Sequence, residues 1–192
     1  MPIATGLTQD ADTLPPNARR ILILGSPGSG KSTLARRLGP ILNLPVVHLD
    51  RLFWKPGWVE SEHEAFDTRV RQALQEPAWI MDGNYGRTLP WRMKHADAII
   101  YLDMPRFYSL RNVIKRQLNQ KPGNRPDMPE GCTERVELAF LKYVWNFRPS
   151  HHDRFLKLLH ESGKPVVVLT RPSQIEPFLD RQRAAQSERL AM

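Results

Sequence analysis

The stretch ILILGSPGSGKSTLARRL, from Ile21 to Leu38, joins an apolar run to a glycine-rich loop and a helix-forming segment. Within it, Gly25 to Ser32 matches the pattern G-x-x-x-x-G-K-[ST] at every defined position. Glycines let the backbone curl so that several N–H groups point inward, and the positive end of the following helix dipole adds to this anion site. The stretch therefore predicts a strand, a phosphate-binding loop and a helix in direct succession.

Three residues of this loop are expected to share the binding of a nucleoside triphosphate. Lys31 is placed to reach the β- and γ-phosphates, the Ser32 hydroxyl to sit on Mg²⁺, and Thr33 to contact the α-phosphate. The alternative is an ordinary glycine-rich turn with a solvated lysine, but the motif lies between a strand and a helix, where phosphate binding requires it. We therefore predict ATP and Mg²⁺ as cofactors. The predicted nucleotide-binding residues of the loop are Gly25, Ser26, Pro27, Gly28, Ser29, Gly30, Lys31, Ser32 and Thr33.

The composition limits the classes of protein and partner. The chain of 192 residues has the size of one domain, and its 28 Lys and Arg against 20 Asp and Glu give a net charge of +8. Such a charge favours anionic partners, which include nucleotides, nucleic acids and anionic membranes. The single cysteine, Cys132, excludes an internal disulfide framework and a multi-cysteine zinc site, and it favours the cytoplasm. The first twenty residues resemble neither a signal peptide nor a membrane span, so no membrane partner is expected.

Five short apolar runs alternate with helical patterns along the chain. Near-continuous apolar strands separated by helices are typical of a parallel sheet with both faces covered, so we predict an α/β fold. The pair Ser61 and Glu64 predicts a capping box that opens a helix towards Leu74, and a second helix is expected from about Arg106 to Asn119. The predicted strands cover Arg20–Leu24, Val46–Leu49, Trp79–Met81, Ala98–Leu102 and Val166–Leu169.

The chain is expected to form one domain from residue 20 to residue 180. A polar, disordered leader over 1–19 precedes it, and a polar segment over 181–192 follows it as a tail or a fraying helix. From about residue 119 to residue 154 the pattern breaks into a loop, an amphipathic helix near Thr133 to Phe147 and a basic segment. We predict that this part is a helical insertion that acts as a lid.

Five stretches of the sequence resemble one known family. The chain is similar to the adenylate-kinase-related P-loop proteins, and within them to the small group labelled DNA topology modulation proteins. The resemblance covers about Ile21 to Leu179 and implies a P-loop NTPase fold with a five-stranded parallel sheet in the order 2-3-1-4-5, a mobile lid and phosphoryl transfer from ATP. It also implies that the adenine ring lies close to the turn of Arg171, Pro172 and Ser173, between the last strand and the last helix; the start of a helix is the alternative for this turn, and both can hold. The five stretches are GSPGSGKSTLARRL, LDRLFWKPGW, WIMDGNYGRT, YLDMPRFYSLRNVIKR and GCTERVELAFLKYVWNFR.

Two carboxylates stand at the ends of predicted strands, Asp50 after the second and Asp82 after the third. Ligands in open α/β sheets lie outside the carboxyl ends of the strands, so both side chains should face the phosphate loop unless they only cap the next helix. Asp82 is similar to the aspartate of the DG pair in nucleoside monophosphate kinases, which implies that it holds a water of Mg²⁺. For Asp50 two roles stay open: it accepts the proton of an acceptor hydroxyl, or it assists Mg²⁺. The predicted metal-site residues are Ser32 and Asp82.

The residues that follow these carboxylates predict an acceptor pocket. Aromatic residues such as Trp54 would stack on a planar or apolar group, although packing of their loop onto the sheet is an equal alternative. In adenylate kinases an arginine four places after the aspartate clamps the acceptor phosphate, whereas here that place is Gly86 and the arginine is Arg87. This departure weakens the case for a nucleoside monophosphate, while an arginine fork for an anion remains available. The predicted acceptor-binding residues are Asp50, Trp54, Asn84, Tyr85, Arg87 and Arg92.

Positive charge is concentrated in and around the predicted lid. The region from Tyr101 to His160 holds 11 Lys or Arg and 6 Asp or Glu, so it carries +5 of the total charge. Phosphoryl transfer needs cations that neutralise the phosphate oxygens and a closure that excludes water. We predict that Arg111, Arg116 and Arg148 contact the transferred group, with a solvated or ion-paired surface position as the alternative for each. The predicted catalytic residues are Lys31, Asp50, Asp82, Arg111, Arg116 and Arg148.

Together these features favour an ATP-dependent phosphotransferase of the cytoplasm that acts on a nucleotide or another small metabolite. Its expected partners are ATP and a small acceptor that is anionic or hydroxylated. The charge and the family label leave a nucleic-acid-associated ATPase or regulator as the alternative, although the sequence has no helix-turn-helix, zinc finger or aromatic RNA-binding signature. A nucleotide-binding switch without chemistry is the third hypothesis.

Overall fold

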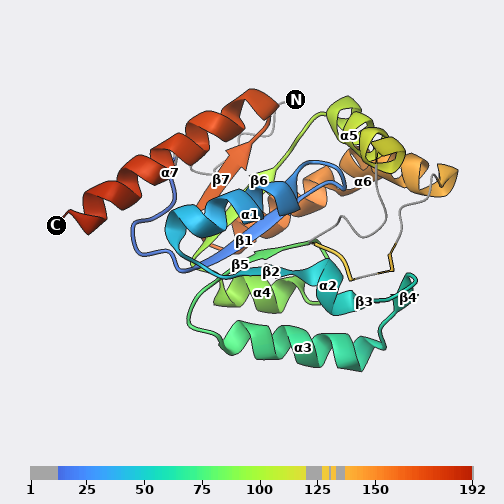
Figure 1. Cartoon of the computed structure of the whole chain (residues 1–192), viewed down its shortest axis with the longest axis horizontal. Coiled ribbons are helices and arrows are strands. Elements are labelled where there is room, and N and C mark those ends of the chain that lie inside the picture. The colour runs from blue at the N-terminus through green and yellow to red at the C-terminus, as the bar shows by residue number, and fades with distance from the viewer. Residues whose placement is uncertain (1–12, 120–126, 130, 133–136, 192) are drawn as a thin grey trace.

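The computed structural model describes residues 13–119, 127–129, 131–132 and 137–191. Its central sheet is made of β1 (Arg20–Gly25), β2 (Val46–His48), β5 (Trp79–Asp82), β6 (Ala98–Leu102) and β7 (Val166–Leu169). All neighbouring strands of this sheet run parallel, in the order β2-β5-β1-β6-β7 (Figure 1). Counted along the chain this is the order 2-3-1-4-5, so the predicted α/β fold and strand order are confirmed.

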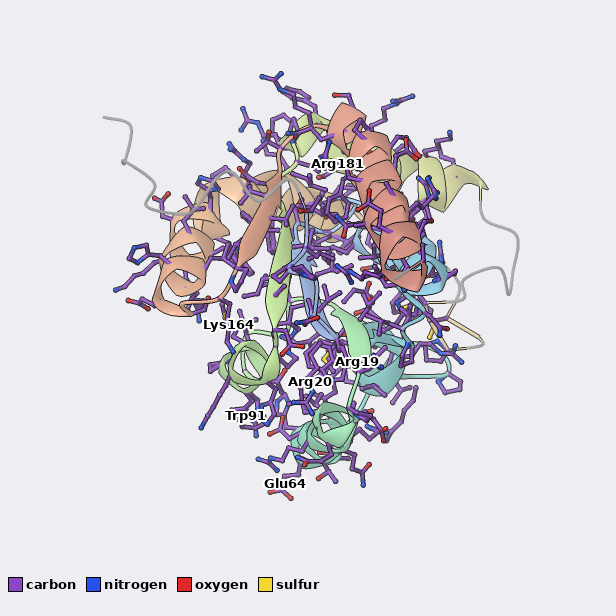
Figure 2. All side chains as sticks on the ribbon, turned by 90° about the vertical axis from the view of Figure 1, so that its left-hand side faces the viewer. Arg19, Arg20, Glu64, Trp91, Lys164 and Arg181 are labelled. Carbon is purple, nitrogen blue, oxygen red and sulfur yellow. The ribbon has the colours of Figure 1, made fainter. Side chains whose placement is uncertain are left out.

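Helices cover both faces of the sheet because consecutive residues of a strand point to opposite sides. In β1, Ile21 and Ile23 pack on one side and Leu22 and Leu24 on the other, and all four are fully buried. Figure 2 shows this sandwich from the side, with the red α7 and the orange α6 on opposite sides of the strands. None of the helices among the described residues is long and apolar enough to cross a membrane. The first side is covered by α1 (Lys31–Leu42) and α7 (Ile175–Leu190), and the second by α3 (His63–Gln75), α4 (Leu89–His95) and α6 (Leu138–Glu161).

The remaining elements gather at the carboxyl ends of the strands (Figure 1). Helix α2 (Leu49–Phe53) follows β2 directly and leads into an antiparallel hairpin of β3 (Trp54–Lys55) and β4 (Val59–Glu60). Helix α5 (Arg106–Asn119) follows β6, and the 3-10 helix η1 (Pro172–Gln174) follows β7. These elements surround the edge of the sheet at which ligands bind in open α/β folds.

The predicted capping box at Ser61 and Glu64 is wrong. Helix α3 begins at His63, its N-cap is Glu62, and no side chain caps it. Ser61 instead follows the hairpin, where its N–H donates to the carbonyl of Phe53 at 2.9 Å. The Ser61 hydroxyl is buried without a hydrogen-bond partner among the described atoms, and the N-cap position falls on Glu62, one residue after Ser61.

Helix α6 is longer than the helix predicted near Thr133 to Phe147. It continues to Glu161, so the basic segment that follows the predicted helix is helical as well, while residues 133–136 lie outside the described residues. Pro149 stands inside this helix, where it removes one backbone hydrogen bond. The apolar face of α6 offsets this cost, because Phe147, Phe155 and Leu159 pack against the sheet and are at most 6% exposed.

The segments predicted as leader and tail both contribute to the described fold. Leu14, within the predicted leader, is 5% exposed and packs in the core beside α1 and α7, while residues 1–12 lie outside the described residues. The polar segment predicted over 181–192 continues α7 as far as Leu190. Within it, Gln182 is buried, which polarity alone did not indicate.

Candidate active site

A cleft of about 1570 Å³ opens beside the glycine-rich loop, at the carboxyl ends of the strands. Small-molecule sites usually occupy about 300–1000 Å³, so this cleft has room for a nucleotide and a second ligand. Its described walls come from the loop with α1, from α2 and the hairpin, from the turn after β5, from α5 and from α6. The predicted site residues that line it are Pro27, Gly28, Gly30, Lys31, Ser32, Thr33, Asp50, Trp54, Asp82, Asn84, Tyr85 and Arg116.

Helix α5 packs on the tip of the loop and fixes its shape. Gly28 has a left-handed φ of 78°, and a Cβ there would collide with the carbonyl oxygen of Ser109 in α5. The side-chain amide of Asn112 donates to the Gly28 carbonyl at 3.0 Å, and the hydroxyls of Ser26 and Ser109 lie 2.9 Å apart. Both the backbone conformation and the close approach of α5 therefore require glycine at this position.

Asn84 fixes the start of the loop. Its Oδ1 accepts the N–H of Gly25 at 3.2 Å, and its Nδ2 donates to the Gly25 carbonyl at 2.8 Å. The sequence predicted Asn84 as an acceptor-binding residue, and the structure commits both ends of its amide to the loop. Ser26 and Ser29 are 7% and 0% exposed, and neither residue lines the cleft. These three loop residues, Gly25, Ser26 and Ser29, thus shape the loop from behind.

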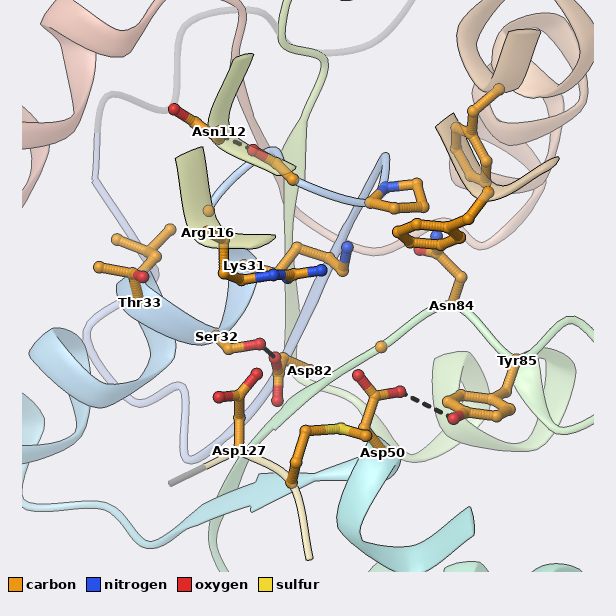
Figure 3. Close-up of a pocket in the computed structure, with 18 of the residues that line it drawn as sticks. Lys31, Ser32, Thr33, Asp50, Asp82, Asn84, Tyr85, Asn112, Arg116 and Asp127 are labelled. Carbon is orange, nitrogen blue, oxygen red and sulfur yellow. Dashed lines mark hydrogen bonds between the residues drawn. The ribbon is translucent and has the colours of Figure 1, made fainter. Parts of the chain in front are cut away.

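Lys31 lies at the centre of the loop (Figure 3). Its Nζ donates to the carbonyl oxygens of Gly25 and Ser26, each at 2.9 Å. Burial lowers the pKa of its ammonium group, and the nearby carboxylates of Asp82 and Asp50 oppose that shift. A cation shielded from water in this way is a strong partner for the oxygens of a phosphate.

Ser32, Asp82 and His48 form a row of hydrogen bonds below Lys31. The Ser32 hydroxyl donates to Asp82 Oδ2 at 2.5 Å, and His48 Nδ1 lies 2.6 Å from Asp82 Oδ1 (Figure 3 draws the first bond). His48 and Asp82 are register partners at the ends of β2 and β5, with side chains 8% and 4% exposed. His48 was not among the predicted site residues. Its position could have indicated a role, because it is a polar residue at the end of an apolar strand, next to a strand that ends in a carboxylate.

The oxygen donors around Ser32 suit Mg²⁺. This ion prefers oxygen ligands and is usually bound by one or two carboxylates together with substrate phosphates and water. Besides the Ser32 hydroxyl and the Asp82 carboxylate, Asp127 lines this part of the cleft and pairs with Arg36 at 3.6 Å (Figure 3). Asp127 was not among the predicted site residues, because nothing in its local sequence indicates that it lies beside the phosphate loop.

Asp50 lines the cleft from α2, and Tyr85 holds its carboxylate. The Tyr85 hydroxyl donates to Asp50 Oδ1 at 2.7 Å (Figure 3). Burial raises the pKa of Tyr85 and the charge of Asp50 adds to this, so the phenol keeps its proton and remains a donor. Tyr85 also has a left-handed φ of 29°, a backbone strain of the kind that clusters at binding sites.

Arg87 and Arg92 do not form the predicted anion fork. Arg87 turns away from the cleft and pairs with Asp67, donating to its Oδ2 from two nitrogens at 2.9 and 3.0 Å. Arg92 is 0% exposed and donates to the carbonyls of Gly83, Asn84 and Tyr85 and to the Thr88 hydroxyl. Both arginines thus support the turn after β5. The prediction is corrected because the turn leaves three buried carbonyls that need donors, and Arg92 supplies them.

Replacing Arg92 with methionine is expected to lower the free energy of unfolding by about 2–4 kcal/mol, since it removes the guanidinium donors of the Gly83 and Asn84 carbonyls inside the protein. Urea denaturation measures the loss. The matched control is Lys94→Met on the same helix, where the side chain is exposed and the expected change is within about 0.5 kcal/mol. Equal denaturation midpoints for the two variants would contradict the structural role of Arg92.

Arg116 is the one of the three predicted catalytic arginines that lines the cleft (Figure 3). Arg111 is exposed on α5 and points elsewhere, because positions five residues apart lie about 140° apart around a helix. Arg148 makes a two-pronged ion pair with Asp103 at the end of β6, at 2.8 and 3.0 Å, and His152 approaches the same carboxylate at 3.3 Å. For Arg111 and Arg148 the expectation of a place in the cleft is therefore corrected.

The turn after β7 borders the cleft through residues other than Arg171. Arg171 is exposed, and its N–H donates to Gln174 Oε1 at 2.8 Å at the start of η1. The side chains that line the cleft here are Pro172, Ile175 and Glu176. Arg171 itself is thus corrected from a nucleotide contact to part of the helix start.

Aromatic side chains line the opposite part of the cleft. The rings of Trp54 and Trp58, from the hairpin, meet edge to face at 5.3 Å. Helix α6 also lines the cleft. Within it Phe147 is buried, whereas Tyr143 is 46% exposed. The α6 residues that line the cleft with aromatic rings are Phe140, Tyr143, Phe147, His151 and Phe155.

The fold is shared with kinases of known structure. No protein-family model and no curated protein sequence matches the chain. Shikimate kinase from Acinetobacter baumannii, in complex with shikimate, has a TM-score of 0.53 and 15% sequence identity, over 91% of this chain and 96% of that one. A candidate kinase from Chloroflexus aurantiacus has a TM-score of 0.51 and 16% identity, over 87% and 98%. At such low identity the likeness shows the fold alone, and it lends no support to the narrower DNA topology modulation group.

Proposed function

We propose that this protein transfers the γ-phosphoryl group of Mg-ATP to a hydroxyl group of a small acceptor. One observation carries the proposal: Lys31, the Ser32–Asp82 pair and the Asp50–Tyr85 pair line a single cleft that has room for two ligands. The kinase fold of the structural neighbours is consistent with it. A site for ATP alone would not account for the Asp50 carboxylate and its partner Tyr85 in the same cleft.

The loop end of the cleft is assigned to the triphosphate. Backbone N–H groups of the loop and the start of α1 receive phosphate oxygens. Lys31 and Arg116 add positive charge where the transferred group carries negative charge. Ser32 and Asp82 would hold Mg²⁺, which neutralises charge on the β- and γ-phosphates when it is bound there with the nucleotide.

Asp50 is proposed as the base, and Tyr85 as the residue that orients it. The Asp50 carboxylate takes the proton of the acceptor hydroxyl as that oxygen attacks the γ-phosphorus. The new bond joins the acceptor oxygen to phosphorus, and the bond from phosphorus to the β,γ-bridging oxygen breaks, so that ADP leaves with the electron pair. Tyr85 fixes one oxygen of the carboxylate at 2.7 Å, which limits the directions in which the other can point.

The acceptor is expected to carry a flat or apolar part next to its hydroxyl. The hairpin tryptophans and the aromatic face of α6 line the same cleft as Asp50, and such rings exclude water and stack on planar groups. The part of the predicted lid that the structure describes, including Met128 and Gly131, also lines the cleft. We therefore keep the predicted lid as the element that shields the reaction from water.

Replacing Trp54 with alanine is expected to raise KM for the acceptor about tenfold while KM for ATP stays within about twofold, since a stacking contact contributes on the order of 1 kcal/mol. Steady-state kinetics with the identified acceptor measures both constants. Trp145→Ala is the matched control, because Trp145 packs on Arg106 and Phe107 and does not line the cleft. Equal effects on the two substrates would contradict a place for Trp54 in the acceptor site.

A coupled assay of ADP formation tests the proposal. The protein is given Mg-ATP with and without nucleosides, nucleoside monophosphates, aromatic alcohols and other hydroxylated metabolites, one at a time. The proposal predicts ADP release that depends on one acceptor class and a phosphorylated product of the expected mass. Slow hydrolysis that no acceptor increases, but that DNA stimulates at about 150 mM salt, would instead favour a nucleic-acid-associated ATPase.

A further inference from the structure

We propose that His48 is a positioning residue that aligns Asp82, and through it Ser32, for Mg²⁺ bound with the nucleotide. The inference rests on the proposed function, because it concerns the metal site of the same cleft. It adds a residue that neither the phosphate-loop motif nor the strand-end carboxylates indicate. His48 does not itself touch the nucleotide in this account, since it does not line the cleft.

The two hydrogen bonds of Asp82 leave its carboxylate in one orientation. Oδ1 faces His48 Nδ1 at 2.6 Å, and Oδ2 accepts from the Ser32 hydroxyl at 2.5 Å. The two contacts come from opposite sides, one from β2 and one from α1, so rotation of the carboxylate would break both. The side chains of His48 and Asp82 are 8% and 4% exposed, and water therefore has little access to replace either partner.

The direction of the protons follows from the chemistry of the three groups. An ionised carboxylate can only accept hydrogen bonds, so the proton lies on Nδ1 of His48 and on the hydroxyl of Ser32. The hydroxyl proton of Ser32 points at Asp82, so the lone pairs of the Ser32 oxygen remain available to a cation in the cleft. A hydroxyl oriented in this way is ready to bind a cation there without first turning.

The sheet itself holds His48 in place. His48 and Asp82 pair in register as the last residues of β2 and β5, which are neighbouring parallel strands. Their relative position is therefore fixed by the backbone ladder and does not depend on a mobile loop. Removal of a group that hydrogen-bonds to a metal ligand commonly changes metal affinity by about 10- to 100-fold.

Removing His48 should therefore weaken the effect of Mg²⁺ on nucleotide binding and leave the phosphate loop intact. Without the imidazole, Asp82 Oδ1 is buried without its donor and the carboxylate can rotate away from Ser32. Lys31 and Asn84 hold the loop through separate hydrogen bonds to its backbone. Nucleotide binding without metal depends on that loop and should be unchanged.

The test measures binding of a non-hydrolysable ATP analogue by titration calorimetry, once with Mg²⁺ and once with EDTA. The variants are His48→Leu, which removes the donor, and His48→Asn, whose amide can restore it. The control is His160→Leu, because His160 is exposed near the end of α6. We expect His48→Leu to lose about tenfold of the Mg²⁺-dependent gain in affinity, with affinity in EDTA within about twofold of wild type. His48→Asn should keep the gain within about threefold, and the control should keep all of it.

A second readout uses the wild-type protein and needs no variant. In protein labelled with ¹⁵N at histidine, the nitrogen spectrum of His48 should report a proton on Nδ1 in the absence of nucleotide and metal. A neutral ring with its proton on Nε2 alone would overturn the inference, and so would an unchanged Mg²⁺ effect in a folded His48→Leu variant. Wild-type protein that binds no nucleotide would overturn the proposed function, whereas normal Mg²⁺-dependent binding with an insensitive His48 overturns this inference alone.

Discussion

Replacing Lys31 with alanine is expected to lower the rate of phosphoryl transfer by about 10²–10³-fold, the largest loss that we expect from a single substitution of a cation in the cleft. The ammonium group lies in the loop, shielded from water, where it would meet the oxygens of the transferred group. Its interaction with those oxygens grows as charge develops in the transition state, so the loss should appear in kcat more than in KM for ATP. Rapid-quench measurement of a single turnover reports it directly.

Folding of the Lys31→Ala variant should be nearly normal. The folded pKa of Lys31 is lowered by burial, so at neutral pH the charged lysine is less favourable in the folded than in the unfolded protein. That penalty lessens only as the pH rises toward the ordinary pKa of lysine, and alanine removes it at every pH. The relief offsets the loss of two hydrogen bonds to the loop, and the melting temperature should stay within a few degrees of wild type. Lys164→Ala is the matched control, and equal turnover in both variants would refute the assignment of the loop.

Replacing Asp50 with asparagine should lower the transfer rate by about 10²–10⁴-fold, because the amide cannot take the proton of the acceptor. The change preserves size and still offers an oxygen to the Tyr85 hydroxyl, so the local structure should hold. Affinity for Mg-ATP should stay within about threefold. Asp153→Asn is the control, since Asp153 is exposed on α6 and does not line the cleft.

The same variant separates the two roles that the sequence leaves open for Asp50. A base is needed only for transfer, so the loss should fall on kcat at saturating acceptor and Mg-ATP. A residue that assists Mg²⁺ would instead weaken Mg-ATP binding while changing metal-free binding little. Full activity of Asp50→Asn with an unchanged pH profile would rule out the base.

The sequence predicts those parts of the structure that depend on local pattern. The motif from Gly25 to Ser32 and the positions of Asp50 and Asp82 after predicted strands predict the loop and one side of the cleft, while the sheet order is implied by the family resemblance. In an α/β sheet the carboxyl ends of parallel strands meet at one edge, so residues far apart in the chain can be placed together from topology alone.

The corrected predictions of site residues concern side-chain direction. Arg92 lies only a few residues from the cleft, yet it turns inward because three buried carbonyls need its donors. Arg148 stands on α6, just beyond the end of the predicted helix, and its guanidinium pairs with Asp103 at the end of β6. These partners are distant in the sequence or belong to the backbone, so a single sequence does not indicate that Arg92 and Arg148 contact them. For the same reason it does not indicate that Asp127 lies beside Ser32.

The most direct measurement of the central claim follows the γ-phosphoryl group itself. ATP labelled with ¹⁸O in that group is incubated with Mg²⁺, the protein and each acceptor that increases ADP release, and the products are analysed by mass. The account predicts labelled oxygen in a phosphorylated acceptor, in an amount equal to the ADP formed above the hydrolytic background. Label found only in inorganic phosphate with every acceptor, in protein that binds Mg-ATP normally, would contradict it.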